Sequence, residues 1–141
     1  KENRPRVCSF FRGIRQSLLL SAIVYRPQFA GNRKGMVILM DENFKVIDNY
    51  LMVKMPQEVD HHKSGYISKT ADDYIMKEGV GNVVFDFEDT RFMDSSGIGI
   101  IIGRYKKISY FGGKVFAINT DTRIKRTLMI CGLHKVIEIM E

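Results

Sequence analysis

The first regular pattern of apolar residues predicts a pair of β-strands. Phe44 and Val46 alternate with polar neighbours, and a denser apolar run follows over residues 50–55. Asp48 and Asn49 separate the two runs, and both residue types tolerate the backbone of a tight turn. A β-hairpin is therefore expected to open the folded part of the chain.

Beyond Pro56 the apolar spacing changes to one that is typical of an amphipathic helix. Asp60 stands where an N-cap is expected, and Gly79 and Gly81 stand where the helix should end. The spacing i, i+4, i+7, i+8 places four apolar residues on one face. These predicted core residues are Ile67, Ala71, Tyr74 and Ile75.

The next two elements are a buried strand and a second helix. Residues 83–87 form a short, nearly continuous apolar run, which predicts a strand that is buried on both faces near the centre of a sheet. The helix follows Asp94 and closes at Gly112 and Gly113. Its predicted inward residues are Ile98, Ile101, Ile102, Tyr105 and Ile108, and its predicted outward residues are Arg104, Lys106 and Lys107.

The remaining apolar runs predict two strands and a third helix. The strands are residues 115–118 and 136–139, and the helix begins at about Thr122 and stops at Gly132. Leu133 is placed for the apolar contact that accompanies a glycine cap. The predicted inward residues of this helix are Ile124, Leu128 and Cys131.

Alternating strands and helices of these lengths predict an α/β fold. Crossover connections of this kind give parallel strands, so the hairpin should lead into a mixed, mostly parallel sheet of about five strands with helices packed on it. The chain has 141 residues, which fits one compact domain, and we assign that domain to residues 36–141.

Charge changes the picture only at the N-terminus. The formal net charge is +6, but residues 1–35 hold eight Lys and Arg and one acidic residue, a net +7. The remaining 106 residues hold 14 basic and 15 acidic residues, a net −1. A near-neutral domain is not expected to bind nucleic acid directly, because phosphate backbones attract strongly basic surfaces.

The basic segment 1–35 has three interpretations. Its apolar run, residues 18–24, is short for a secretory signal and too short to span a membrane. An Arg-rich, acid-poor composition also fits an organelle transit peptide. The interpretation that we favour is a translated upstream region, with Met36 or Met40 as the true start of the protein. If the segment is part of the protein, we expect it to be disordered. Cys8 and Cys131 offer no spacing for a disulfide framework or a zinc site, which indicates a reducing cytoplasm.

One polar motif lies where a strand region meets the N-terminus of the second helix. It consists of Asp94, Ser95, Ser96 and Gly97. Helix N-termini present unpaired N–H groups and a partial positive charge. Taken alone, the motif fits an ordinary N-cap in which Asp94 or Ser95 caps and the glycines allow close packing.

The wider sequence resembles the STAS family, and within it the anti-sigma factor antagonists of endospore formers. The resemblance covers residues 43–141. It is carried by four segments in order, namely Glu58-Val59-Asp60-His61-His62, Phe92-Met93-Asp94-Ser95-Ser96-Gly97-Ile98-Gly99 with Gly103-Arg104-Tyr105-Lys106, Ile124-Lys125-Arg126, and Cys131-Gly132-Leu133-His134-Lys135-Val136-Ile137.

The resemblance implies a phosphorylation switch rather than an enzyme. Ser95 would be phosphorylated by a partner that is both anti-sigma factor and serine kinase, and a serine phosphatase would reset it. The unphosphorylated form would bind that kinase and free the sigma factor. No cofactor is expected on this chain, because Mg-ATP would be used by the kinase.

The resemblance also marks a partner-binding surface. Asp60 matches the acidic residue that the family places beside the docking surface, and helix capping is its alternative role. The remaining predicted contacts, besides Ser95, are Met93, Asp94, Ser96, Gly97 and Ile98. Relatives usually have glycine where Gln57 stands, so the loop before Asp60 departs from the family pattern.

Other chemistries fit the sequence less well. A serine hydrolase would need a nucleophile elbow that the chain lacks. His61 and His62 beside Asp60 have no third metal ligand at a suitable spacing. The glycines of the Ser95 motif match a dinucleotide loop only loosely. The main alternative is a STAS module of a general stress-response or other partner-switching assembly, with a weak homodimer allowed and no membrane association expected.

Overall fold

The computed structural model describes the backbone of residues 37–140 and the side chains of residues 42–140. The predictions for residues 1–35, including Cys8, fall outside the described residues. The strands are β1 (Val37–Asp41), β2 (Phe44–Ile47), β3 (Tyr50–Lys54), β4 (Glu58–Val59), β5 (Asn82–Asp86), β6 (Phe92–Met93), β7 (Val115–Ile118) and β8 (Glu138–Ile139). The helices are α2 (His61–Glu78), α3 (Ser95–Tyr110), α4 (Thr122–Ile130) and the 3-10 turn η1 (Leu133–Lys135).

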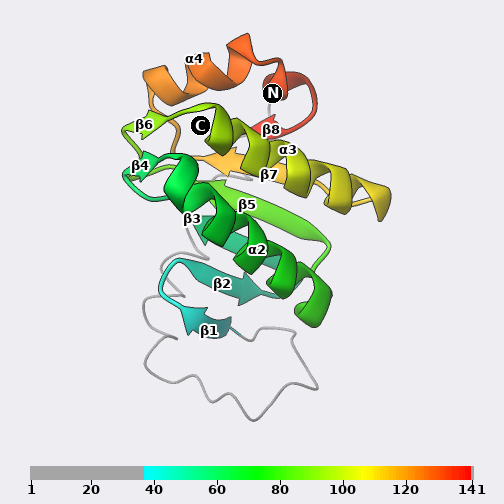
Figure 1. Ribbon diagram of the computed structural model, residues 1–141. Coiled ribbons are helices and arrows are strands. Elements are labelled where there is room, and N and C mark those ends of the chain that lie inside the picture. The colour runs from blue at the N-terminus through cyan, green and yellow to red at the C-terminus, as the bar shows by residue number, and fades with distance from the viewer. Residues whose placement is uncertain (1–36, 141) are drawn as a thin grey trace.

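The main sheet has six strands in the order β1-β2-β3-β5-β7-β8 (Figure 1). β1, β2 and β3 are antiparallel, whereas β3, β5, β7 and β8 are parallel to one another. This arrangement confirms the predicted α/β fold with a mixed, mostly parallel sheet. The predicted hairpin is β2–β3, and Asp48 takes a left-handed φ of 52° in its turn.

β1 extends the sheet by one strand that the sequence did not predict. It pairs with β2 and carries an irregularity in register between Leu39 and Asp41. Its sequence, VILMD, is an apolar run without alternation, and a run of that kind does not distinguish a strand from the end of a helix. Its position beside β2 turns the predicted hairpin into a three-stranded antiparallel unit.

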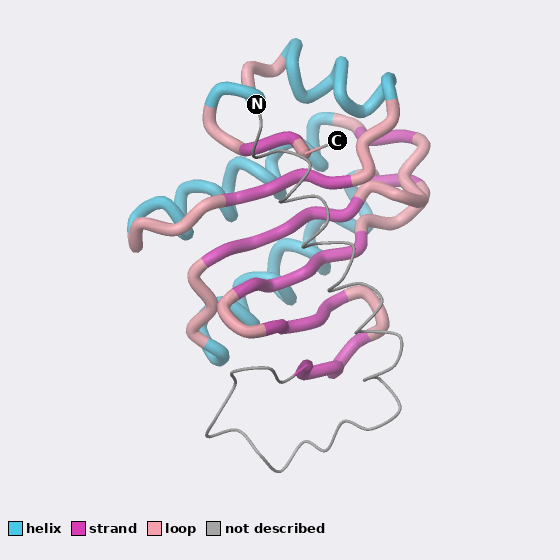
Figure 2. Tube along the Cα trace, turned by 180° about the vertical axis from the view of Figure 1, so that it is seen from behind, coloured by secondary structure: helices cyan, strands magenta, loops and turns pink. Residues whose placement is uncertain are grey.

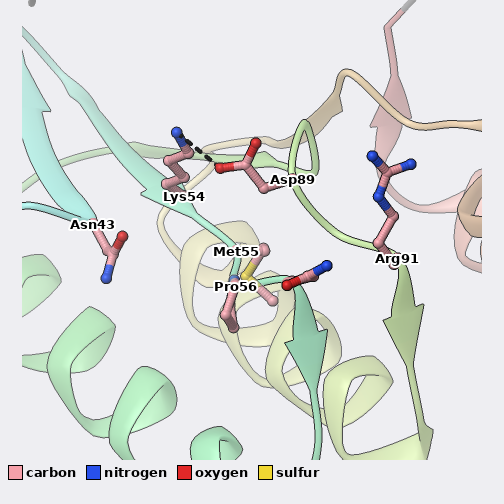
Figure 3. A pocket seen from close by; sticks show the side chains of 7 residues that line it. Asn43, Lys54, Met55, Pro56, Asp89 and Arg91 are labelled. Carbon is pink, nitrogen blue, oxygen red and sulfur yellow. Dashed lines mark ion pairs between the residues drawn. The ribbon is translucent and has the colours of Figure 1, made fainter.

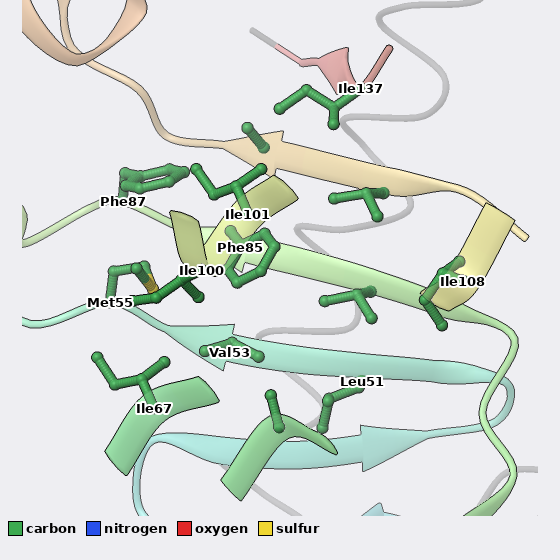
Figure 4. Packing of buried hydrophobic residues seen from close by; sticks show 14 of the residues in the cluster. Leu51, Val53, Met55, Ile67, Phe85, Phe87, Ile100, Ile101, Ile108 and Ile137 are labelled. Atoms are coloured by element: carbon green, nitrogen blue, oxygen red, sulfur yellow. The ribbon is translucent and has the colours of Figure 1, made fainter. Parts of the chain in front are cut away.

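The helices α2 and α3 lie side by side on one face of the sheet (Figure 1). Between them and the sheet lies the main core, which includes Leu51, Val53, Phe85 and Ile101, each no more than 1 % exposed (Figure 4). All four residues predicted for the inner face of α2 are buried. The sheet and the two helices therefore form the layers that hold the Ser95 segment.

The opposite face of the sheet carries a second, smaller apolar cluster, and no described helix covers it (Figure 2). Its members alternate with core residues along the strands, as the pleat of a sheet requires. They are Ile47, Met52, Val84, Phe116, Ile118 and Met140. Because β5 lies between β3 and β7 and is apolar on both faces, its predicted central position is confirmed.

Two side-chain predictions for the later elements are wrong, and one core residue was missed. Arg104 is 6 % exposed rather than outward-facing, and Ile100, which was not assigned to the core, is buried. Cys131 follows the end of α4 and is exposed, whereas Ile124 and Leu128 are buried as predicted. The last strand is only Glu138–Ile139, because η1 occupies Leu133–Lys135.

Candidate docking surface around Ser95

A two-stranded parallel ribbon, β4–β6, aligns the two segments that the sequence marked as partner contacts. Val59 in β4 lies opposite Met93 in β6, and the Asp94 N–H donates to the Val59 carbonyl oxygen at 3.2 Å. Each strand leads directly into a helix. Asp60 and Asp94 are therefore adjacent positions at the ends of parallel strands, each beginning a helix.

Both aspartates are N-caps. The Asp60 carboxylate accepts the Lys63 N–H at 3.0 Å at the start of α2. The Asp94 carboxylate accepts the Ser96 N–H at 2.8 Å and the Gly97 N–H at 3.4 Å at the start of α3. The motif therefore has Asp94, and not Ser95, as its cap, and the predicted capping role of Asp60 is confirmed.

The hydrogen bond from the Lys63 backbone lowers the pKa of the Asp60 carboxyl from its ordinary value of 3.8. The positive charges of Lys63 and His62 lower this pKa further. Asp60 is thus ionised at neutral pH. Asp60 and Asp94 place two carboxyl groups at paired N-terminal helix ends, where the helix carries a partial positive charge.

Ser95 is the first residue of α3 and is exposed. Ser96, the next residue, is only half-exposed, and its N–H is bound by the Asp94 cap. The Ser95 side chain is therefore accessible to another molecule while the helix stays folded. The predicted contact residues Asp60, Met93, Asp94, Ser95 and Gly97 are brought together at one end of the molecule; their role in binding stays a prediction.

Close packing around Gly97, the third residue of α3, explains why the motif has a glycine at this position. A Cβ atom on Gly97 would overlap the Met93 side chain and would lie 3.0 Å from Val59 Cγ1. The close approach seats the first turn of α3 directly on the β4–β6 ribbon. Met93 is 7 % exposed beneath it and Ile98 is half-buried, so both belong mainly to the core and offer little surface to a partner.

The sequence missed the ion-pair cluster that joins α2 to α3. Arg104 Nε lies 2.9 Å from Asp72 Oδ1, and Lys107 Nζ lies 2.8 Å from Asp72 Oδ2. Burial lowers the pKa of the Arg104 guanidinium, and the Asp72 charge opposes that shift. A search for apolar periodicity assigns every arginine to the solvent-facing side of a helix. The only signal in the sequence is that α3 carries two basic residues three positions apart, Arg104 and Lys107, which can both meet one carboxylate on α2.

The histidines show no metal-binding arrangement. His61 and His62 are exposed in the first turn of α2, with ring centroids 6.4 Å apart. Within residues 37–140, no group of three or more His, Cys, Asp or Glu residues could hold a metal ion. In the same part of the chain, no helix combines the length and apolarity required to cross a membrane.

Residues 43–141 match the family profile of the STAS domain. The chain belongs to the STAS domain family. This STAS domain is 34% identical over 91 residues to an anti-sigma F factor antagonist of Paenibacillus polymyxa, covering 64% of this chain and 78% of that protein. It is 27% identical over 82 residues to an anti-sigma-B factor antagonist of Listeria monocytogenes, covering 58% and 71% of the two chains.

Solved structures agree on the fold. The unphosphorylated anti-sigma factor antagonist SpoIIAA aligns with a TM-score of 0.59 at 21% identity, over 75% of this chain and 86% of that one. The phosphorylated form of SpoIIAA, described as a Bacillus cell fate determinant, aligns with a TM-score of 0.56 at 21% identity, over 75% and 90%. These solved structures show the STAS fold, and the family match together with the similarity to named antagonists supports the predicted class, a regulatory binding protein rather than an enzyme.

Proposed function

We propose that this STAS domain is an anti-sigma factor antagonist switched by phosphorylation of Ser95. The unphosphorylated form binds an anti-sigma factor that is also a serine kinase, and the bound sigma factor is released. Phosphorylation of Ser95 by that kinase ends the interaction, and a serine phosphatase restores it. The observation that carries the proposal is the exposure of Ser95 at the first position of α3, directly after the Asp94 cap that ends the β4–β6 ribbon.

A phosphate on Ser95 would alter the surface rather than the fold. It adds close to two negative charges at neutral pH, and a helix N-terminus is a favourable place for an anion. Asp94 immediately precedes it, and Asp60 caps the neighbouring helix. The phosphate would add charge beside these two carboxylates and would occupy the space where the kinase docks, so the surface would no longer match a partner that fits the unphosphorylated form.

The similarity to named antagonists favours a sporulation sigma factor. Identity to the anti-sigma F factor antagonist is 34%, compared with 27% for the anti-sigma-B factor antagonist. The second candidate, an antagonist in a stress-response assembly, is supported by the anti-sigma-B relatives. Both candidates use the same surface, place the protein in the cytoplasm and leave Mg-ATP to the kinase.

The test uses the full chain together with the anti-sigma kinase of the same organism. The chain is incubated with the kinase and Mg-ATP, and the phosphorylated residue is located by peptide mass spectrometry. Binding of unphosphorylated wild type, Ser95→Ala and Ser95→Asp to the kinase is then measured by calorimetry. Ser96→Ala is the matched control, because Ser96 is the adjacent serine and its own hydroxyl is not part of the Asp94 cap.

The proposal expects phosphate on Ser95 only. Ser95→Ala should bind the kinase with close to wild-type affinity but accept no phosphate, and Ser95→Asp should bind at least about tenfold more weakly. Ser96→Ala should still accept phosphate on Ser95, so it controls for the position of the phosphate. Phosphate on another residue, or Ser95→Asp binding as tightly as wild type, would overturn the proposal.

A further inference from the structure

The outer end of the β4–β6 ribbon carries a pocket of about 370 Å³ that the Ser95 switch does not use (Figure 3). Asn43 and Lys54 line one side, Asp89 and Arg91 line another, and the turn at Met55, Pro56 and Gln57 lies between them.

The two sides of the pocket are tied together. Thr90 is 2 % exposed, and its hydroxyl donates to the Pro56 carbonyl oxygen at 2.9 Å. The backbone N–H groups of Arg91 and Phe92 both donate to the Gln57 carbonyl oxygen, at 2.8 Å and 3.2 Å. The segment that carries Arg91 is therefore fixed against the turn, and the pocket exists before any partner arrives.

The charge of the pocket is positive. Lys54 Nζ lies 3.1 Å from Asp89 Oδ2, so these two charges offset each other. Arg91 is exposed, and among the described residues no carboxylate pairs with its guanidinium. Arg123 does not line the pocket but places a second cation beside it, because its Nη1 donates to the Arg91 carbonyl oxygen at 3.4 Å. The guanidinium fork of arginine matches a carboxylate with two parallel hydrogen bonds.

The shape of the pocket indicates whether it would bind a small molecule or a side chain of another protein. Sites for small molecules bury most of the ligand among apolar side chains. Here Asn43, Gln57, Asp89 and Arg91 are all exposed, so the pocket is shallow, polar and open to solvent. Such a site suits the side chain of a protein that also contacts the neighbouring surface.

The ribbon connects the pocket to the switch. β6 is two residues long and lies between Arg91 and Asp94, so these two residues are three steps apart, roughly 10 Å along the strand. A partner docked over Ser95 would therefore also reach the pocket. The docking surface has two charge zones, an acidic one at Asp60 and Asp94 and a basic one at Arg91 and Arg123.

We propose that the Lys54–Arg91 pocket receives an acidic side chain of the anti-sigma kinase and so extends the docking surface beyond Ser95. The inference rests on the proposed function, since it names the chemistry of that same partner. It predicts that the kinase carries an aspartate or glutamate next to the groups that contact the Ser95 end of α3. Arg91, rather than the already paired Lys54, supplies most of the attraction.

The test compares Arg91→Glu with Lys106→Glu, which makes the same change in net charge on the exposed side of α3. Lys106 lies 11 residues beyond Ser95, about 16 Å along the helix. Kinase affinity of the unphosphorylated full chain is measured at low and high salt. Arg91→Glu should weaken binding about tenfold or more at low salt, mainly through a slower association rate, and Lys106→Glu should weaken it less than about twofold.

A charge-swap experiment then identifies the partner residue. Each surface aspartate and glutamate of the kinase is changed to arginine, and binding to wild type and Arg91→Glu is measured. One kinase variant should bind Arg91→Glu more tightly than it binds wild type. If no variant does so, or if Arg91→Glu binds like Lys106→Glu, the inference is overturned.

The outcomes separate this inference from the proposed function. If wild type neither binds the kinase nor accepts phosphate on Ser95, the proposed function fails and takes the inference with it. If wild type binds and is phosphorylated but Arg91→Glu is indistinguishable from the control, only the inference fails. Inorganic phosphate alone is also titrated into the chain while the NMR signals of Arg91 are followed. If phosphate shifts these signals and binds tightly enough to compete with the kinase, the pocket is a small-anion site and the inference is overturned.

Discussion

At the scale of single residues, Gly97 is the position where packing leaves least freedom. A Gly97→Ala substitution would force its Cβ into the Met93 side chain, and overpacking of this kind costs about 1–3 kcal/mol. Thermal or urea unfolding should show that loss. Gly99→Ala is the matched control, because nothing lies within 4 Å of a Cβ there and alanine should stabilise the helix by up to about 1 kcal/mol.

The clash is specific to Met93, which allows a second check. Adding Met93→Ala to Gly97→Ala should cost less than the sum of the two single changes, because the smaller side chain makes room for the new methyl group. Strict additivity would show that Gly97 is needed for some reason other than contact with Met93.

Asp60 gives a pH-dependent prediction. Its folded-state pKa is below the ordinary 3.8, so the cap contributes stability above that value and loses it as the pH falls through the folded-state pKa. NMR titration of the Lys63 amide should therefore show a transition below pH 3.8. Asp60→Asn caps without titrating in this range, so it should remove the transition at Lys63 and leave α2 intact. A transition above pH 3.8 would contradict the assignment.

Prediction from sequence succeeded for residues whose role depends on nearby positions in the chain, and it failed for residues whose burial depends on contacts with other elements. The Asp60 cap and the apolar face of α2 follow from residue type and spacing, and the structure confirms both. The predictions for Arg104 and Cys131 were wrong because a helical period indicates which side of a helix a residue lies on, but not whether neighbouring elements bury it or where the helix ends. Arg104 is buried because Asp72 on another helix meets it, and Cys131 lies beyond the last residue of α4.

At the scale of elements, the Asp72 cluster holds α2 and α3 together and so fixes the spacing of the two helix ends that carry Asp60 and Ser95. Asp72→Asn would leave the buried Arg104 charge without its partner, which should cost about 2–4 kcal/mol. Arg104→Met removes that charge and keeps most of the volume, while Asp72 retains Lys107. We therefore expect Arg104→Met to be the less destabilising change.

Urea unfolding of the two variants measures that order directly. Lys107→Met is the control for a partly exposed pair member, and it should cost less than about 1 kcal/mol. Equal losses for Asp72→Asn and Arg104→Met would mean that the cluster contributes packing only.

The elements that the sequence missed are the short or non-alternating ones. β4 and β6 have two residues each, which is too few for a period of two to be recognised. β1 has five residues without alternation. The β4–β6 ribbon nevertheless carries the site, because it brings Asp60 and Asp94 to adjacent positions although they lie 34 residues apart in the sequence. Their closeness depends on the pairing of β4 with β6 in the folded chain, so the sequence of either segment alone does not predict it.

At the scale of the whole molecule, phosphorylation of Ser95 should leave the fold unchanged. The helix end stabilises an added anion by about 0.3–1 kcal/mol, and repulsion from Asp94 and Asp60 opposes that gain. The melting temperature of the phosphorylated chain should therefore differ from that of the unphosphorylated chain by only about 5 °C or less. NMR spectra should show shifts confined to the ribbon and the first turns of α2 and α3; widespread shifts would indicate a refolding switch.

The fold class was predictable because its strands and helices alternate with clear periods over residues 44–139. The Ser95 switch follows only from the resemblance to the STAS family and stays a prediction. Taken alone, the motif fitted an ordinary cap better than a switch, and the structure shows that Asp94 does cap α3. Capping and switching are therefore compatible roles of one motif, carried by neighbouring residues.

The most direct test of the central claim is displacement of a labelled sigma factor from its complex with the anti-sigma kinase. Unphosphorylated chain and chain stoichiometrically phosphorylated on Ser95 are titrated into that complex, without ATP, and sigma release is followed by fluorescence anisotropy. The account predicts that unphosphorylated chain releases the sigma factor and that phosphorylated chain needs at least about a hundredfold higher concentration. Equal release by the two forms would contradict it.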